Sequence, residues 1–182
     1  MFRAFCKLVF KLIGWGFEGH APQDIPKFVL VIAPHTSNWD FVIGILARSI
    51  VRWGNVKYLA KKELFVFPFG MFFRAMGGYP VNRTKHTRLV DNVVQLFNSK
   101  EKFAIAITPE GTRKKVAQLK TGFYYIASKA NTAMILVGFD FSKKKVIISD
   151  PMYASGNQEQ DLEEITAFFR NVTGKIPENG ID

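Results

Sequence analysis

The stretch FVLVIAPHTSNWD, residues 28–40, decides the fold class. Its first half, Phe28–Ala33, is a short apolar run rich in β-branched side chains, which predicts a buried strand. Pro34 ends that strand, and from about Asn38 to Arg52 the apolar residues recur at helical spacing. A strand that leads through a polar loop into a helix is the repeating unit of an α/β protein.

The rest of the chain continues this alternation. The further strands expected are Val56–Ala60, Tyr79–Asn82, Phe103–Ile107, Ala133–Phe139 and Val146–Ser149. The further helices expected are Phe69–Met76, His86–Ser99, Thr121–Lys129 and Glu159–Asn171. The pattern predicts one α/β domain with a mixed, mostly parallel sheet flanked by helices, because 182 residues suit a single domain and no linker or repeat interrupts them. The tight turn at 143–145 predicts that the last two strands are antiparallel.

Composition narrows the classes of protein and of partner. With 48% hydrophobic and 22% charged residues, the chain has enough apolar material for a packed core. Its single cysteine, Cys6, excludes a disulfide within the chain and any cysteine-cluster metal site, and a packed, inert thiol is expected there. No uncharged apolar run reaches the ~18–20 residues that cross a bilayer. A net charge of +10 favours an anionic partner: nucleic acid, a phosphorylated ligand or acidic lipid headgroups.

Residues 1–18 predict a basic amphipathic helix that precedes an α/β domain of residues 19–182. Its apolar residues at helical spacing are Phe2, Phe5, Val9, Leu12 and Ile13, and its cations are Arg3, Lys7 and Lys11. Such a helix lies in a membrane surface and meets acidic lipids, or it packs on its own domain with a solvated basic edge. Both interpretations remain open, and one helix can pack on the domain and bind the membrane surface at the same time.

His35 and Asp40 are the candidate catalytic pair. The loop that holds them follows a strand and opens a helix, where open α/β sheets bind ligands. If His35 lies in the loop and Asp40 in the first helical turn, the carboxylate can orient the imidazole and leave its other nitrogen as a general base. The sequence Ser37-Asn38-Trp39-Asp40 is also a capping-box pattern, so a purely structural Asp40 is the alternative.

A second cluster of candidate residues follows the expected strand Phe103–Ile107. Glu110, Gly111, Thr112 and Arg113 form a glycine-containing loop, and Lys120 comes shortly after it. A glycine lets backbone N–H groups approach a ligand, and an arginine offers a fork that matches phosphate oxygens. Arg83 follows another short strand. Together these residues favour an anion cradle, although each arginine alone is compatible with a solvated surface.

Four segments in order resemble the motif blocks of the glycerolipid (lysophosphatidic acid) acyltransferase family. They are His35 to Asp40, Gly78 to Arg83, Pro109-Glu110-Gly111-Thr112-Arg113 and Leu119-Lys120-Thr121-Gly122, and the resemblance spans roughly Phe28 to Phe139. It implies an α/β fold and, in phospholipid biosynthesis, transfer of a fatty acyl group to a lysolipid hydroxyl, most directly that of lysophosphatidic acid.

The resemblance also implies the donor and the residue roles. The acyl group comes from a thioester of coenzyme A or acyl carrier protein, which is a co-substrate, and no cofactor or metal is implied. His35 is then the general base and Asp40 its orienting partner. The implied substrate-binding residues are Arg83, Glu110, Gly111, Thr112, Arg113 and Lys120.

Two departures from the family pattern leave the acceptor open. Asn82 stands where an acidic residue is common, and the segment 134–137 lacks the usual proline. A lysolipid without phosphate is therefore an alternative acceptor, and a thioester hydrolase or a noncatalytic lipid-surface protein is an alternative function.

The expected partners are the lysolipid, acyl-CoA or acyl carrier protein, and an anionic membrane surface. The expected location is cytoplasmic, peripheral on the inner face of the membrane. Nucleic acid is not expected, because the phenylalanines lie in apolar runs rather than between the cations. The longest of these runs, residues 64–73, is a candidate acyl-chain lining or second membrane-dipping surface, with ordinary core as the alternative.

Overall fold

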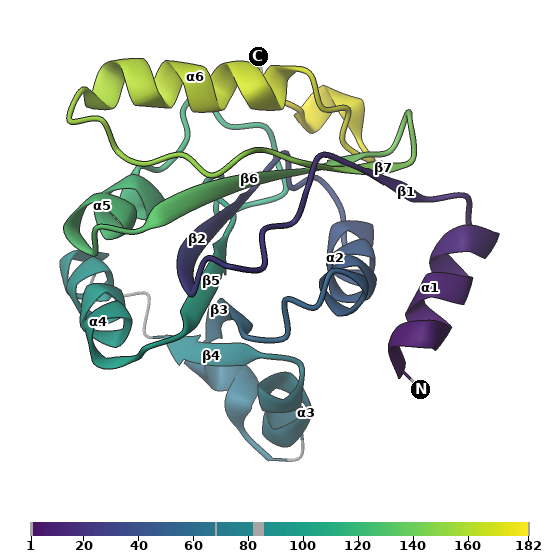
Figure 1. The fold of residues 1–182 in the computed structure, drawn as a ribbon, viewed down its shortest axis with the longest axis horizontal. Coiled ribbons are helices and arrows are strands. Elements are labelled where there is room, and N and C mark those ends of the chain that lie inside the picture. Colours follow the sequence, from purple (N-terminus) through teal and green to yellow (C-terminus); the bar gives the residue numbers. More distant parts are fainter. Residues whose placement is uncertain (1, 68, 82–85, 182) are drawn as a thin grey trace.

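Seven strands form one sheet in the computed structural model, which describes residues 2–67, 69–81 and 86–181 (Figure 1). The spatial order is β1-β7-β6-β2-β5-β3-β4. The strands are β1 Gly16–Glu18, β2 Lys27–Ile32, β3 Val56–Lys61, β4 Gly78–Val81, β5 Phe103–Ile107, β6 Ala133–Asp140 and β7 Lys145–Ile148. All neighbours are parallel except β6 and β7, which form the expected antiparallel pair. The predicted fold class is confirmed.

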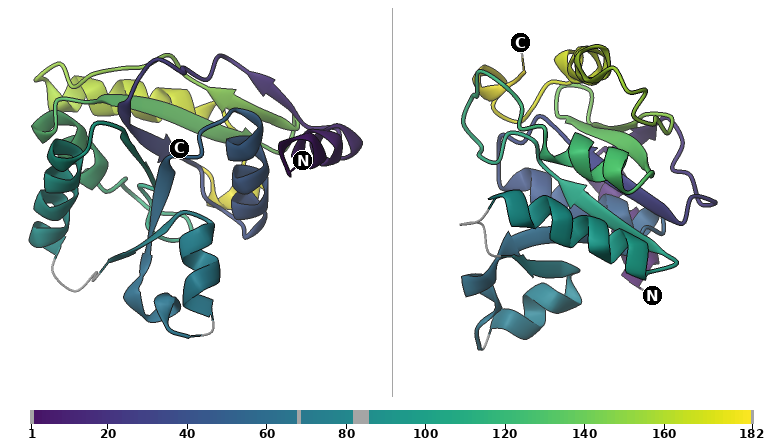
Figure 2. Two further views of the ribbon diagram at one scale, coloured as in Figure 1. Left: turned by 60° about the horizontal axis from the view of Figure 1, so that its bottom comes forward. Right: turned by 90° about the vertical axis from the view of Figure 1, so that its left-hand side faces the viewer.

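The helices cover both faces of this sheet. They are α1 Phe2–Leu12, α2 Trp39–Ile50, α3 Phe69–Ala75, α4 His86–Ser99, α5 Gly122–Lys129 and α6 Gln158–Arg170, with 3-10 turns η1 Lys62–Phe65 and η2 Pro177–Asn179. One core cluster joins the sheet to α4, α5 and α6, and the other joins it to α1 and α2. The short α3 lies beside β4, near the edge of the sheet (Figures 1 and 2).

Strand β2 shows why a continuous apolar run becomes a central strand. Val29 and Val31 belong to one core cluster, whereas Phe28 and Leu30 belong to the other. Successive strand residues point to opposite faces, so a strand with helices on both faces buries every side chain. The neighbouring β6 is buried along its full length for the same reason.

Helix α1 packs on the domain by one side only. Cys6 and Phe10 are buried, which confirms the expected packed thiol, whereas Phe2, Phe5 and Leu12 are exposed. The helix ends at Leu12, short of the expected boundary, because the chain turns at Gly14 and then forms β1. Strand β1, missed by the sequence analysis, pairs with β7. The division of the chain at residue 18 stays a prediction.

The apolar run at 64–73 divides between core and surface. Phe65 is buried, and its ring packs against that of Phe73 at 6.1 Å between centroids. Val66, Phe67 and Met71 are exposed, and the Phe67 side chain is 92% accessible. Ordinary core therefore accounts for part of this run, and among its described side chains Val66, Phe67 and Met71 face solvent.

Candidate active site

The topology brings the two predicted loops to one edge of the sheet. Strands β2 and β5 are adjacent and parallel, with Val31 opposite Ile107. Their carboxyl ends therefore release the loops that carry His35 and Glu110 side by side. The backbone N–H of His35 donates a hydrogen bond of 2.6 Å to Glu110 Oε1, which ties the loops together across 75 residues of sequence.

His35 and Asp40 lie in contact, as the sequence analysis predicts. His35 Nδ1 lies 3.0 Å from Asp40 Oδ2. The imidazole is 20% exposed, whereas the Asp40 side chain is 1% exposed. If Nδ1 donates its proton to the carboxylate, Nε2 is left with a lone pair at an accessible position, as a general base requires.

Asp40 is also a structural group. Its Oδ2 accepts hydrogen bonds of 2.8 Å from the backbone N–H groups of both Thr36 and Ser37, at the entry to α2. The Ser37 hydroxyl accepts the N–H of Trp39, the first residue of α2, at 3.2 Å. The same oxygen therefore fixes the loop before α2 and contacts the imidazole, and its role in orienting a catalytic base stays a prediction.

Glu110 is a buried carboxyl that faces the His35 loop. Burial raises its pKa, opposed by the hydrogen bond from the His35 backbone N–H. Its Oε2 has no hydrogen-bond partner among the residues that the structure describes. The hydrogen bond from His35 joins Glu110 to the His35 loop, and the expected role of Glu110 in binding the acceptor stays a prediction.

Gly111 allows a close approach by Lys120. Its φ is +65°, a conformation that side chains disfavour, and a Cβ there would lie 2.6 Å from Lys120 Nζ. The Lys120 backbone N–H also donates to the Pro109 carbonyl at 2.9 Å. The ammonium of Lys120 is thereby held against the loop that begins with Glu110.

The remaining predicted site residues lie on the surface or outside the described residues. Thr112 and Arg113 are exposed, and Arg113 has no side-chain partner in the described ranges. The Thr112 hydroxyl accepts the Lys114 backbone N–H at 3.3 Å. Arg83 falls within residues 82–85, which are outside the described residues, so its place in the site stays a prediction.

Sequence reasoning missed a C-terminal contribution to both loops. The Ile176 backbone N–H donates to Thr36 Oγ1 at 3.2 Å, and Asn179 Oδ1 accepts the Lys115 backbone N–H at 3.2 Å. Gly174 packs so closely on Thr36 that a Cβ would lie 2.8 Å from its hydroxyl oxygen. The glycine was the one sequence signal available, and it does not reveal a partner 138 residues away.

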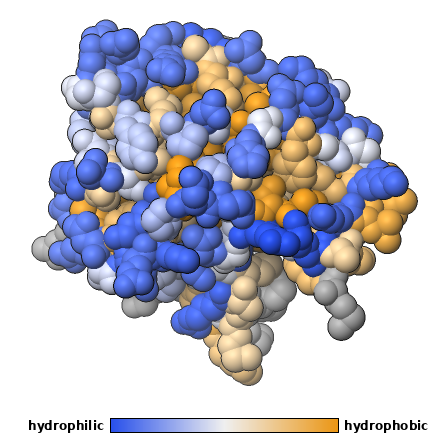
Figure 3. All heavy atoms as spheres, in the orientation of Figure 1, coloured by the Kyte–Doolittle hydropathy of each residue, from blue (hydrophilic) through white to orange (hydrophobic). Residues whose placement is uncertain are grey.

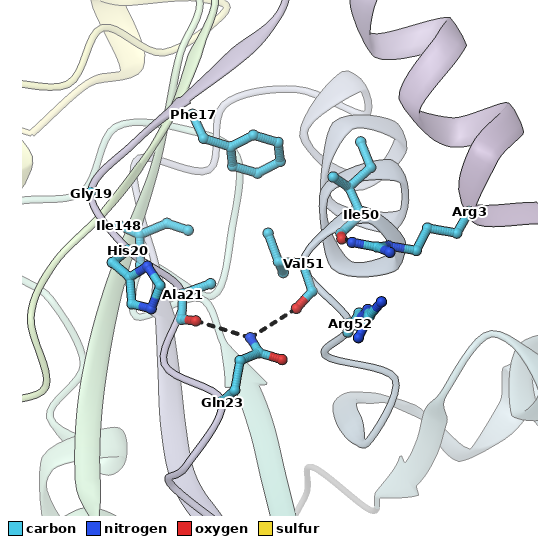
Figure 4. A pocket seen from close by; sticks show the side chains of 10 residues that line it. All are labelled: Arg3, Phe17, Gly19, His20, Ala21, Gln23, Ile50, Val51, Arg52 and Ile148. Carbon is cyan, nitrogen blue, oxygen red and sulfur yellow. Dashed lines mark hydrogen bonds between the residues drawn. The ribbon is translucent and has the colours of Figure 1, made fainter.

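A cavity of about 380 Å³ lies at the opposite end of α2 from Asp40 (Figure 4). There the Arg3 Nε–H donates to the Ile50 carbonyl, and the Gln23 side-chain amide donates to the carbonyls of Ala21 and Val51. The bonds to Ile50 and Val51 satisfy carbonyls at the end of α2, and the Arg3 bond joins α1 to α2. The lining includes none of the predicted site residues.

No group of three or more His, Cys, Asp and Glu side chains is placed to hold a metal ion within the described ranges. A reaction without a metal ion stays a prediction.

A model of the acyltransferase family matches residues 17–140, well over half of the chain. The chain belongs to the acyltransferase family. A comparison with curated protein sequences gives no match. The solved structure of the 1-acyl-sn-glycerophosphate (LPA) acyltransferase PlsC from Thermotoga maritima is similar in fold to this acyltransferase, with a TM-score of 0.60 and 19% sequence identity, and the match covers 90% of this chain and 74% of that one.

Proposed function

We propose that this acyltransferase moves a fatty acyl group from the thioester of coenzyme A or acyl carrier protein to the hydroxyl of a lysolipid, with lysophosphatidic acid as the preferred acceptor in phospholipid biosynthesis. The observation that carries the proposal is the accessible His35 imidazole held 3.0 Å from Asp40, on a loop bonded to the Glu110 loop. The family match supports the reaction class.

In the proposed reaction, His35 acts as the base. Its Nε2 takes the proton of the acceptor hydroxyl while the oxygen attacks the thioester carbonyl carbon. A tetrahedral intermediate forms, the carbon–sulfur bond breaks, and the departing thiolate receives the proton from the imidazolium. Asp40 stabilises the imidazolium and holds the ring with Nε2 toward the substrate, as in other acid–base–nucleophile systems.

The choice of a phosphorylated acceptor rests on the cations of the Glu110 loop, which is bonded to the His35 loop. Lys120 lies against Gly111, and Arg113 is exposed on the same loop. A phosphate held there would receive charge-assisted hydrogen bonds that a neutral headgroup cannot form to the same extent. Arg83 is the further phosphate ligand that the family resemblance implies.

Attachment to a membrane surface suits a reaction whose acceptor and product are lipids. We assign this attachment to α1, which exposes Phe2, Phe5 and Leu12 and carries Lys7 and Lys11 toward acidic headgroups. Within the described residues, no helix is both long and apolar enough to cross a bilayer. The proposed location is cytoplasmic, peripheral on the inner face of the membrane.

The test compares His35→Ala with His20→Ala as the matched control. His20 is exposed and lines the cavity at the end of α2 that lies away from Asp40. Each protein receives a labelled acyl thioester with and without lysophosphatidic acid, and products are scored by mass. We expect His35→Ala to lose about 10²- to 10⁴-fold in transfer and the control to lose little. Near-normal transfer by His35→Ala would contradict the mechanism.

The same assay separates the alternatives. Release of free fatty acid at an undiminished rate without any acceptor indicates a thioester hydrolase. Equal transfer to a lysolipid that lacks phosphate removes the role proposed for the Lys120 and Arg113 cations.

A further inference from the structure

Exposed apolar side chains gather on three helices that lie on one side of the molecule. Among the described residues, the exposed large apolar side chains fall into three groups, apart from Tyr125 and Tyr153. The first group lies in α1 and just after it, the second at the start of α2, and the third in the segment from Val66 into α3. In the space-filling view, apolar atoms are prominent toward the right, over α1 (Figure 3). The members are Phe2, Phe5, Leu8, Leu12, Ile13, Trp39, Phe41, Val42, Val66, Phe67 and Met71.

Helix α1 contacts α2 directly, and α2 is joined to α3 through Tyr58 of β3 and through Met76, the residue after α3. The Arg3 side chain of α1 bonds to the Ile50 carbonyl of α2 at 2.9 Å. The Arg48 guanidinium of α2 donates to the carbonyl of Met76, just after α3, at 2.6 Å. The rings of Phe41 and Tyr58 meet edge to face at 5.6 Å, next to α3. The helices follow one another along one side of the fold in Figure 2 (left).

The charges on this side suit an acidic surface. Helices α1, α2 and α3 contain five basic residues, Arg3, Lys7, Lys11, Arg48 and Arg74, and their acidic residue Asp40 is buried. Helix α6, packed in the opposite core cluster, contains Glu159, Asp161, Glu163 and Glu164 against Arg170. Solvent-exposed aromatic and aliphatic tips flanked by cations are the features that bind a protein to a bilayer with anionic lipids.

We propose that the exposed apolar residues of α1, α2 and α3 form one membrane-contact face, in which the α3 tip, Val66, Phe67 and Met71, enters the lipid surface together with α1. The occupant is a bilayer surface that contains anionic phospholipid. This inference deepens the proposed function, on which its biological use rests, because it adds a second point of insertion to the α1 anchor.

The second point of insertion fixes an orientation that one helix alone cannot. A single amphipathic helix leaves the domain free to rotate about it, whereas α1 and α3 on either side of α2 hold the start of α2 toward the lipid. Trp39, Phe41 and Val42 lie there, next to Asp40. The His35 loop then opens at the lipid interface, where an acceptor with a long acyl chain resides.

The experiment measures binding to vesicles of phosphatidylcholine, with and without phosphatidylglycerol, by sedimentation. The variant Phe67→Ser/Met71→Ser removes the α3 tip, and Tyr125→Ser/Tyr153→Ser is the matched control, since both tyrosines are exposed outside the proposed face. We expect at least tenfold weaker binding of the α3 variant to anionic vesicles, unchanged binding of the control, and weaker binding of all proteins to neutral vesicles.

Two results would overturn the inference: binding of the α3 variant equal to that of the unmodified protein, or an equal loss in the tyrosine control. A change in oligomeric state of the α3 variant without a change in vesicle binding would instead assign the face to a second copy of the chain. Thermal unfolding of both variants checks that the fold is retained.

The vesicle result is independent of the reaction. Transfer to a short-chain, water-soluble lysolipid should be nearly the same for the α3 variant and the unmodified protein. If that transfer is absent from the unmodified protein, the proposed function fails while the binding result still decides the membrane-contact face.

Discussion

Replacing Asp40 with Asn separates the two roles of this carboxylate. The Oδ2 atom accepts the Thr36 and Ser37 backbone N–H groups and also lies 3.0 Å from His35 Nδ1. In Asp40→Asn, the amide oxygen must face the same backbone donors, so it occupies the position of Oδ2. An Nδ1–H group of the imidazole then keeps an oxygen partner, while the negative charge is lost and an NH2 group takes the place of Oδ1, which is buried without a hydrogen-bond partner among the described residues.

The size of the effect follows from the distance. Two unit charges 3.0 Å apart attract by roughly 5 kcal/mol at an effective dielectric constant of about 20. Because the imidazolium is only partly formed in the transition state, we expect a loss of about 3 kcal/mol, which corresponds to a fall in kcat of roughly 10²-fold. Asp40→Ala should lose at least as much activity and also leave the buried Thr36 N–H without its acceptor, at about 1–3 kcal/mol of unfolding free energy.

The assay pairs steady-state acyl transfer with denaturant unfolding for both variants. Asp40→Asn should be nearly as stable as the unmodified protein but much slower, whereas Asp40→Ala should be both slower and less stable. An unchanged kcat in Asp40→Asn would refute the proposal that the negative charge of Asp40 stabilises the imidazolium. Equal destabilisation by Asn and Ala would refute the reasoning about the shared oxygen.

Three further substitutions test the loops. Glu110→Gln keeps an oxygen for the backbone N–H and removes a carboxyl whose pKa is raised by burial, so its unfolding free energy should match or exceed that of the unmodified protein at neutral pH. This advantage should vanish as pH falls below the unfolded pKa of the carboxyl, and denaturant titrations across that range check the sign. Arg113→Ala should raise the KM for lysophosphatidic acid with little change in kcat, whereas Lys114→Ala, in the same loop, should not; equal KM values remove Arg113 from the acceptor site. Gly174→Ala should lower the unfolding free energy by about 1–3 kcal/mol through overpacking, while Gly54→Ala, with open space around it, should have a small effect in the same measurement.

The sequence was sufficient to predict which loops meet. Parallel strands place their carboxyl ends at one edge of a sheet, and the buried runs at Phe28–Ala33 and Phe103–Ile107 identify two such strands. The candidate base and the glycine loop follow those runs directly. Their juxtaposition therefore depends on local patterns and on one topological rule, and both are readable from the chain.

Other parts of the site depend on contacts that no local pattern encodes. Spacing alone left two roles open for Asp40, and only the folded structure shows that one oxygen contacts both the backbone N–H groups and the imidazole. The direction of the Glu110 side chain could not be predicted from the sequence either, because a carboxylate after a strand can face a ligand or the neighbouring loop. Strand β1 is three residues long, and its pairing with β7 comes from distant sequence rather than from its own propensity.

The bonds from Ile176 and Asn179 mean that part of the support for the two candidate loops comes from beyond the matched family segment, which stops at residue 140. A shortened protein that ends at Val172 would retain every candidate catalytic side chain. It would lose the hydrogen bonds from Ile176 and Asn179 to the two loops.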